Sequence, residues 1–173
     1  MSRVDELVVN FAIYEDAVEY LGMAEVELPE ISALTEEITG AGIAGNVEAV
    51  VIGHFEAMTL KLNFRTVTDA TIRLNEPRIH MIDLRAAQQS ENTTTKKIDI
   101  DSMKYIMRVR PKKLAPGKVG VATKADASGE YAITYYAIYK NGVKKVEIDQ
   151  LNFIYYVDGT DYLADVRAAL GKN

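Results

Sequence analysis

Apolar and polar side chains alternate along most of the chain, and this two-residue period predicts β-strands. Within residues 55–65, Leu60, Leu62 and Phe64 fall on one face and polar side chains fall on the other. Residues 24–28 and 103–109 show the same alternation. These three runs predict half-buried strands, each with one face on a core.

The strongest local prediction is a β-hairpin near the C-terminus. Residues 131–140 are rich in Tyr, Ile and Thr, and Asn141 and Gly142 follow directly. Asn-Gly is favoured in two-residue hairpin turns because both turn positions need a positive φ. The sequence therefore predicts a strand, a tight turn and a return strand here.

The return strand changes phase part-way along its length. Its apolar residues occupy even positions up to Ile148 and odd positions from Leu151 onwards. In a regular strand such a change would turn the second apolar set to the opposite face. We therefore predict a β-bulge near Asp149 and Gln150.

Two short helices are also predicted. Thr68 is a suitable N-cap for a helix over residues 68–74. Near the C-terminus, Thr160 or Asp161 would cap a second helix that ends at Gly171. The apolar stripe of this second helix is Leu163, Val166 and Leu170.

Several predicted strands are longer than the usual length of about five or six residues. We therefore expect a mainly β fold, an antiparallel β-sandwich or barrel with a short flanking helix and a C-terminal helix, whose sheet continues into neighbouring subunits. The chain of 173 residues predicts one domain over 1–173. We expect an extended loop at about 30–47 and an irregular excursion at about 111–129, where glycine, proline and small polar residues gather.

Composition narrows the possible chemistry. Apolar residues make up 48% and charged residues 26%, and the net charge is −5. A net acidic chain argues against a groove that grips nucleic acid by neutralising phosphates. With no cysteine, the sequence offers no disulfide, zinc-thiolate site or thiol nucleophile. An acidic start and the lack of a long apolar run predict folding in the cytoplasm, with no membrane span.

Residues 40–45 match the G-x-G-x-x-G pattern of dinucleotide-binding turns. That pattern binds a pyrophosphate only between a buried strand and a helix. Here Glu36 and Glu37 precede it, and the β-branched run 47–52 follows. The context favours a flexible or assembly-ordered loop over a nucleotide site.

Other candidate groups also favour structural roles. His54 and His80 have no nearby nucleophile motif and no metal-site spacing, so both are interpreted as structural or surface residues. Tyrosines gather in 131–139 and at 155–156, without the interleaved basic residues of a nucleic-acid surface, and predict cross-strand packing. No catalytic residue, cofactor site or metal site is predicted.

Three pairs of acidic residues lie two positions apart, which places each pair on one face of a strand. They are Glu25 with Glu27, Asp99 with Asp101, and Glu147 with Asp149. We interpret them as solvated strand faces, or as parts of one acidic surface, in preference to acid–base pairs.

Several stretches together carry a resemblance to a known family. They are 130–136, Asn141-Gly142, 147–153, 157–161 and 167–171, and, nearer the N-terminus, Asn10-Phe11, 20–22, 26–29, Glu37 and 40–45. In this order and spacing they resemble the major tail tube proteins of contractile-tailed phages and tail-like particles. Residues 111–129 have no match, and the turn at 14–17 lacks the glycine expected there.

The resemblance implies a structural virion protein and no enzyme. Family members form hexameric rings that stack into a hollow tube, in which strands from all subunits close an inner β-barrel. The partners implied are further copies of the chain, the tail sheath, the tape measure and baseplate or tail-end proteins, with DNA only in transit and no membrane or small-molecule substrate. The chain would be assembled in the host cytoplasm and end in the virion tail.

Residue roles follow from the same resemblance. An extended loop reaches the neighbouring ring in the family, and the candidates for it are Glu37, Gly40, Gly42, Ile43 and Gly45. The lumen is typically acidic, so DNA slides and does not stick. The candidates for that lining are Glu25, Glu27, Asp99, Asp101, Glu147 and Asp149.

Other functions stay open at this point. A phage-tail-like bacteriocin or a type VI secretion apparatus uses a similar tube. A solitary β-barrel that binds a small ligand would instead have a closed apolar pocket. A nucleotide-dependent enzyme would need the glycine pattern to bind a dinucleotide.

Overall fold

The computed structural model describes residues 3–19 and 22–172. Residues 20 and 21, part of one family-like stretch, lie outside the described chain. The strands are β1 (Arg3–Glu15), β2 (Val18–Glu19), β3 (Met23–Glu27), β4 (Ala33–Ile38), β5 (Val47–Phe55), β6 (Met58–Phe64), β7 (His80–Asn92), β8 (Lys97–Ala115), β9 (Ala127–Lys140), β10 (Val143–Asp149), β11 (Ile154–Val157) and β12 (Thr160–Asp161). The helices are α1 (Asp69–Arg73) and α2 (Ala164–Ala169).

Strand β9 is the centre of the main sheet. One of its edges pairs with β8 along most of its length, and its other edge is shared. The first half of that shared edge, 127–133, pairs with β6, and the second half, 135–140, pairs with β10. The sheet therefore divides at β9 and folds over itself, with β6 and β3 on one branch and β10, β11 and β12 on the other.

The core lies under the inner faces of β6, β7, β8 and β9. Every second residue of β6 is buried, so the predicted strand with Leu60, Leu62 and Phe64 on its inner face is confirmed. It begins at Met58, because Phe55 ends β5. The other core residues come from β1, β7, β8, β9 and β10, together with Leu74 behind α1. Tyr131 fits between them because the ring lies directly over Gly129, where any β-carbon would come within 2.5 Å of the phenol oxygen. The expected antiparallel, mainly β fold is confirmed.

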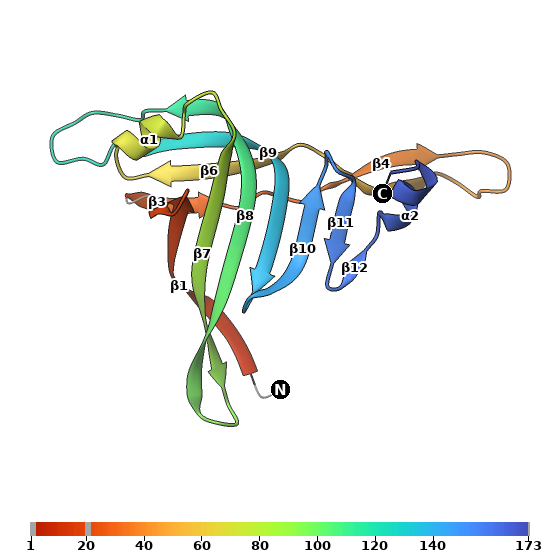
Figure 1. The fold of residues 1–173 in the computed structure, drawn as a ribbon, viewed down its shortest axis with the longest axis horizontal. Helices are drawn as coiled ribbons and strands as arrows, with labels where there is room; N and C mark the ends of the chain where they lie inside the picture. The colour runs from red at the N-terminus through yellow and green to blue at the C-terminus, as the bar shows by residue number, and fades with distance from the viewer. Residues whose placement is uncertain (1–2, 20–21, 173) are drawn as a thin grey trace.

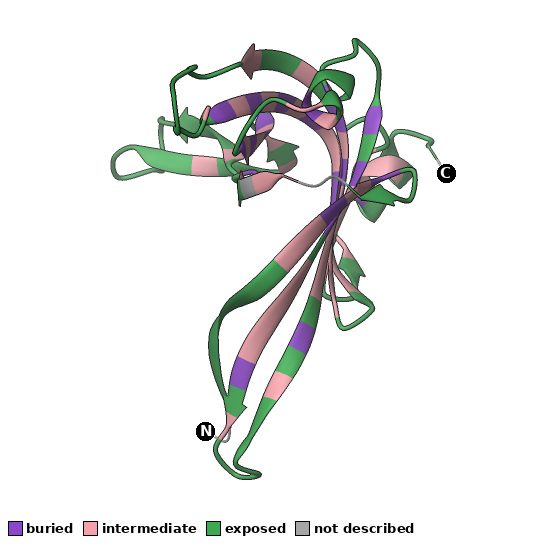
Figure 2. Cartoon of the chain, turned by 90° about the vertical axis from the view of Figure 1, so that its left-hand side faces the viewer, coloured by how far each residue is buried: buried purple, intermediate pink, exposed green. Residues whose placement is uncertain are grey.

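Three projections leave this core (Figure 1). The N-terminal half of β1 and the β7–β8 hairpin form a leg that points down in that view, with mostly exposed or half-buried residues (Figure 2). The β4–β5 hairpin is a separate two-stranded sheet and forms an arm at one end of the longest axis. The connection 116–126 forms a loop at the opposite end.

Several local predictions are confirmed. Asn141 and Gly142 form the β9–β10 turn, with φ of 50° and 78°. Thr68 caps α1, since its hydroxyl accepts a hydrogen bond from the amide of Thr71. Asp16 and Ala17 make a two-residue turn between β1 and β2 with φ of 49° and 64°, so the missing glycine does not prevent the turn.

The predicted bulge near Asp149 and Gln150 is wrong. The chain reverses there, and β10 pairs with β11 as a hairpin in which Asp149 lies opposite Ile154. A reversal also moves the apolar positions from even to odd, which is why the two patterns look alike in sequence. The register does shift in the β9–β10 pair, but between Lys144 and Val146.

Other boundaries differ from the sequence-based expectations. The C-terminal helix begins after Leu163, because Thr160 and Asp161 form strand β12. The stretch expected as a loop at 30–47 contains strand β4. In the stretch 111–129, only residues 116–126 lie outside strands, because β8 runs through Pro111 to Ala115 on the edge of β9.

Candidate functional site

The arm carries all the residues proposed for the inter-ring loop. Thr35, Glu36, Glu37 and Ile38 of β4 pair with residues 47–50 of β5. The connection contains a turn in which the amide of Ile43 donates to the carbonyl of Gly40 at 3.2 Å. A β-carbon at Gly40, Gly42 or Gly45 would meet no atom within 4 Å, so the loop stands free of the rest of the fold.

Close packing fixes the base of the arm. The rings of Phe55 and Tyr155 meet edge to face with centroids 4.9 Å apart, and Tyr162 adds a third ring 5.7 Å from Tyr155. Gly53 has a φ of 69°, and a β-carbon there would lie 2.4 Å from the side chain of Leu163. The arm is therefore held against β11 and the start of α2.

The leg carries a group of exposed apolar side chains. Its exposed apolar side chains are Val4, Leu7, Val8, Val9, Ile98 and Ile100. In the described chain, residues 3–11 of β1 pair with β7 on one edge only, and the other edge is open. Two register shifts in this stretch place extra residues on β1. An open edge with apolar side chains is a surface that another strand can extend.

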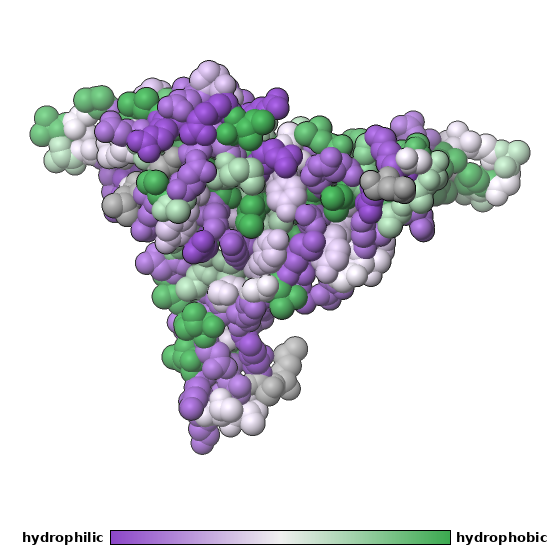
Figure 3. All heavy atoms as spheres, in the orientation of Figure 1, coloured by the Kyte–Doolittle hydropathy of each residue, from purple (hydrophilic) through white to green (hydrophobic). Residues whose placement is uncertain are grey.

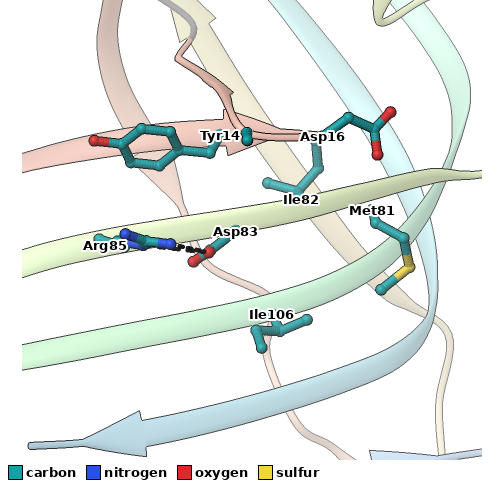
Figure 4. A pocket seen from close by; sticks show the side chains of 8 residues that line it. Tyr14, Asp16, Met81, Ile82, Asp83, Arg85 and Ile106 are labelled. Carbon is teal, nitrogen blue, oxygen red and sulfur yellow. Dashed lines mark hydrogen bonds and ion pairs between the residues drawn. The ribbon is translucent and has the colours of Figure 1, made fainter. Parts of the chain in front are cut away.

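The face of the sheet away from the core contains a hollow of about 500 Å³ (Figure 4). Arg85 crosses it, pairing with Asp83 at 2.8 Å and lying 4.8 Å from the ring centre of Tyr14. The hollow is open along one side and lined partly by charged groups. It therefore lacks the closed apolar form expected of a small-ligand barrel.

A chain of polar contacts crosses the same face farther along β8 and β9. Arg108 lies 5.5 Å from the ring centre of Tyr135, whose hydroxyl donates to Glu147 at 2.8 Å. Lys144 pairs with Glu147 and lies over the ring of Tyr156. Burial, together with the bond to Glu147, raises the pKa of Tyr135, so this phenol stays neutral and donates. The tyrosines thus pack across strands, as predicted.

The six acidic candidates do not share one environment. Glu25 and Glu27 are exposed on β3, and Asp99 is half-buried on β8. Asp101 is buried between Arg3, Lys140 and Asn141, and the hydrogen bond from Asn141, aided by the two cations, lowers the pKa of Asp101.

The third pair, Glu147 and Asp149, makes hydrogen bonds within β9, β10 and the turn that follows β10. Asp149 is buried and accepts hydrogen bonds from the amides of Leu151 and Asn152, both at 3.1 Å, which holds the β10–β11 turn. Glu147 is engaged by Tyr135 and Lys144. Asp101 and Asp149 therefore present no free charge to a surface, whereas Glu25 and Glu27 are exposed, and Glu27 pairs with Lys61 at 3.4 Å.

One buried polar cluster was not foreseen from the sequence. His80 is fully buried, and its Nδ1 lies 2.6 Å from Glu15 while its Nε2 lies 3.0 Å from the carbonyl of Glu76. Arg78 pairs with the same Glu15 carboxylate at 3.1 Å. The cluster joins the end of β1 to the start of β7. Sixty-five residues separate His80 from Glu15, so no local pattern could reveal the pair.

Among the described residues, no group of three or more His, Cys, Asp or Glu side chains is arranged to hold a metal ion. Over the same residues, no helix is both long enough and apolar enough to cross a membrane.

The model of the family described as phage tail tube protein FII matches residues 5–171. The chain belongs to this family. The curated tail tube protein of Escherichia phage P2 is 23% identical over 162 residues, which cover 92% of this chain and 93% of that protein. The family resemblance noted from the sequence is therefore confirmed.

Two solved structures are similar to this tail tube family member in fold. One is a chain of the sheath/tube terminator of an extracellular contractile injection system, PVC, in the extended state, with a TM-score of 0.53, 13% identity and coverage of 78% of this chain and 96% of that one. The other comes from the PVC sheath–tube complex in the extended state, with a TM-score of 0.50, 13% identity and coverage of 75% and 87%. At this identity the likeness concerns the fold of the tail tube chain and not its contacts.

Proposed function

We propose that this chain polymerises as stacked hexameric rings into the hollow inner tube of a contractile phage tail, through which DNA is ejected. Membership of the tail tube family supports the tube itself. The observation that carries the ring is strand β1, whose outer edge is open over residues 3–11 and whose apolar side chains are exposed. Such an edge is a hazard in a solitary protein and a contact in an assembly.

Within a ring, the leg would supply the contact between subunits. A neighbouring strand on the edge of β1 would satisfy its free amide and carbonyl groups and cover Leu7 and Val9, which are 62% and 53% exposed. Repeating this contact around a ring would leave no free edge.

Between rings, the arm would reach the next subunit. A β-carbon added at Gly40, Gly42 or Gly45 in its loop would have open space around it, and Ile38, Ile43, Val47 and Val50 are exposed on the arm. Ordering this segment against a neighbour would bury that apolar surface. We further propose that Glu25 and Glu27 contribute negative charge to the lumen, where repulsion keeps DNA sliding.

Family relationships extend the proposal to partners. The sheath would surround the tube, and the tape measure and baseplate or tail-end proteins would meet its interior and its ends. The chain would be made in the host cytoplasm, would catalyse no reaction and would become part of the virion tail.

Negative-stain electron microscopy across a protein concentration series tests the proposal. Rings or hollow tubes that lengthen with concentration are expected, and sedimentation should show the matching growth in mass. If the protein stays monomeric at every concentration, with and without a tail initiator complex, the proposal fails.

A second candidate is the tube of an injection apparatus or a phage-tail-like bacteriocin. It is favoured by the fold shared with two chains of an extracellular contractile injection system. Both candidates predict the same tube. Neighbouring capsid and terminase genes would indicate a phage, and their absence beside sheath and baseplate genes would indicate the second candidate.

A further inference from the structure

The negative charge of the chain is concentrated around the arm. Between Pro29 and Leu60 there is no Lys or Arg, and there are five glutamates: Glu30, Glu36, Glu37, Glu48 and Glu56. These five equal the whole net charge of −5, so the rest of the chain holds 20 acidic residues against 20 basic ones. The arm is therefore an acidic projection on an otherwise balanced protein.

Two of these glutamates oppose each other within the arm. Glu37 lies directly across from Glu48 in the β4–β5 pair, and Glu36 is the next residue along. Like charges at opposed positions destabilise a hairpin. In the described chain no basic side chain pairs with any of the three. The arm thus keeps a repulsion that a cationic partner would relieve.

A basic segment lies elsewhere in the same chain. Residues 108–126 contain six Lys or Arg residues and one acidic residue, Asp126. Within this segment, the loop 116–126 is closed at its base by a hydrogen bond from the amide of Lys118 to the carbonyl of Ala125, at 2.9 Å, and by the pair of Lys118 with Asp126 at 3.1 Å. Because the base of the loop is fixed, the tip of the loop points away from the core.

The tip of this loop is apolar as well as basic. Val119 and Val121 are 106% and 97% exposed, the most exposed large apolar side chains among the described residues. Lys118 and Lys124 flank them. Two fully exposed valines between two lysines are complementary to a surface that is both apolar and acidic.

The arm has that combination and lies at the far end of the molecule. The loop and the arm occupy opposite ends of the longest axis (Figure 1), and apolar residues are visible at both ends (Figure 3). The two segments of one chain therefore do not meet each other. Two copies placed end to end would bring them together, and each further copy could repeat the contact.

We propose that the basic loop 116–126 of one copy docks on the acidic β4–β5 arm of the next copy. Val119 and Val121 would pack on the exposed apolar residues of the arm. Lys124, and Lys118 on leaving its exposed partner Asp126, would neutralise the opposed pair Glu37 and Glu48. The contact rests on the proposed tube function and specifies which surface receives the arm. Complementary charge would also set the direction of stacking, because loop–loop and arm–arm contacts repel.

Charge reversal with complementation tests the contact. An arm variant, E36K/E37K/E48K, has two basic ends. A variant of the basic segment 108–126, K113E/K118E/K124E, changes Lys113 on β8 and two loop lysines and has two acidic ends. Each alone should need at least about ten-fold more protein to form tubes than the unchanged chain. An equimolar mixture should assemble, because each basic end then meets an acidic one.

The chain carrying all six substitutions is the matched control, since its net charge equals that of the unchanged protein. It should assemble alone. Circular dichroism confirms that each variant is folded. Normal assembly of the single-end variants, or no assembly of the mixture and the six-fold variant, overturns the contact.

Cross-linking gives a second readout in a chain that has no cysteine of its own. Ala44→Cys on the arm and Ala122→Cys on the loop, combined in one protein, should give a ladder of disulfide-linked oligomers on mild oxidation of tubes. Each single variant should give none beyond dimers. Tubes that form without this ladder overturn the docking contact alone, whereas a protein that never forms tubes overturns the proposed function.

Discussion

At the residue scale, the two histidines differ sharply in their surroundings. His80 is fully buried and contacts an acceptor with each ring nitrogen, whereas His54 is exposed on β5. A carbonyl can only accept, so Nε2 donates to Glu76, while Nδ1 lies 2.6 Å from the Glu15 carboxylate. The imidazole therefore holds the end of β1 against the start of β7.

Replacing His80 with Ala should destabilise the fold. The change leaves a cavity and removes both hydrogen bonds, so the free energy of unfolding should fall by about 2–4 kcal/mol. Urea denaturation of the unassembled protein measures it. His54→Ala is the matched control and should change stability by less than about 0.5 kcal/mol. Equal effects of the two substitutions would contradict a structural role for the buried cluster.

Burial of Tyr131 makes stability depend on alkaline pH. Burial raises the pKa of Tyr131 from its ordinary value of 10 to about 12. In the folded protein the phenol therefore stays neutral at a pH where the unfolded chain already ionises it. The stabilisation is fully present below pH 10 and is lost as pH rises toward 12.

The Tyr131→Phe variant should lose less stability between pH 10 and pH 12 than the unchanged protein. The difference should be on the order of 2 kcal/mol, because one pKa unit corresponds to about 1.4 kcal/mol. Thermal unfolding at a series of pH values measures it, with Tyr162→Phe, at an exposed position, as the control. Parallel losses for all three proteins would show that Tyr131 does not carry the effect.

At the element scale, the arm depends on its contact with α2. Gly53→Ala would place a methyl group against Leu163 and would also adopt a φ of 69° that disfavours alanine. Gly42→Ala meets a similar backbone cost, at a φ of 92°, but in open space. The difference between the two variants isolates the packing at the base of the arm.

Gly53→Ala should therefore lower the free energy of unfolding by about 1–3 kcal/mol more than Gly42→Ala. It should also impair tube formation, because a displaced arm cannot reach its neighbour. Denaturation and electron microscopy of both variants test this together. A Gly42→Ala variant that is the less stable of the two would rule out close packing as the cause.

The elements that could be predicted are those with local causes. The inner face of β6, the Asn141-Gly142 turn and the Thr68 cap each depend on residues within a few positions of one another. The β10–β11 reversal at Asp149 escaped prediction because a bulge and a turn shift the apolar phase alike. The branching of the sheet at β9 also left no pattern in the sequence, since pairing between distant strands has no local signature.

The same distinction applies to the candidate functional surfaces. The glycine pattern at 40–45 identified a free loop, because glycine-rich stretches are local signals. The acidic pairs were indistinguishable in sequence. In the structure, Asp101 and Asp149 are buried and accept hydrogen bonds within the chain, whereas Glu25 and Glu27 are exposed. Only the fold reveals which charges remain available to a partner.

At the scale of the whole molecule, large apolar side chains are exposed on three separate projections. The leg, the arm and the loop 116–126 each extend away from the core and carry exposed valine, leucine or isoleucine side chains. Soluble monomers rarely expose large contiguous apolar patches, and such patches mark interaction sites. The shape and the surface therefore favour a subunit over a solitary protein.

The leg permits a direct test of the ring contact. In Leu7→Lys/Val9→Lys, both altered side chains are largely exposed in the single chain, so folding should be unaffected, within about 0.5 kcal/mol. Two lysines on an edge strand oppose the addition of another strand, because the charges would have to be buried or brought together. Electron microscopy and sedimentation should then show folded monomers without rings. Ile72→Lys, at an exposed apolar position on α1, is the matched control and should still form tubes; rings from the double variant would place the ring contact away from β1.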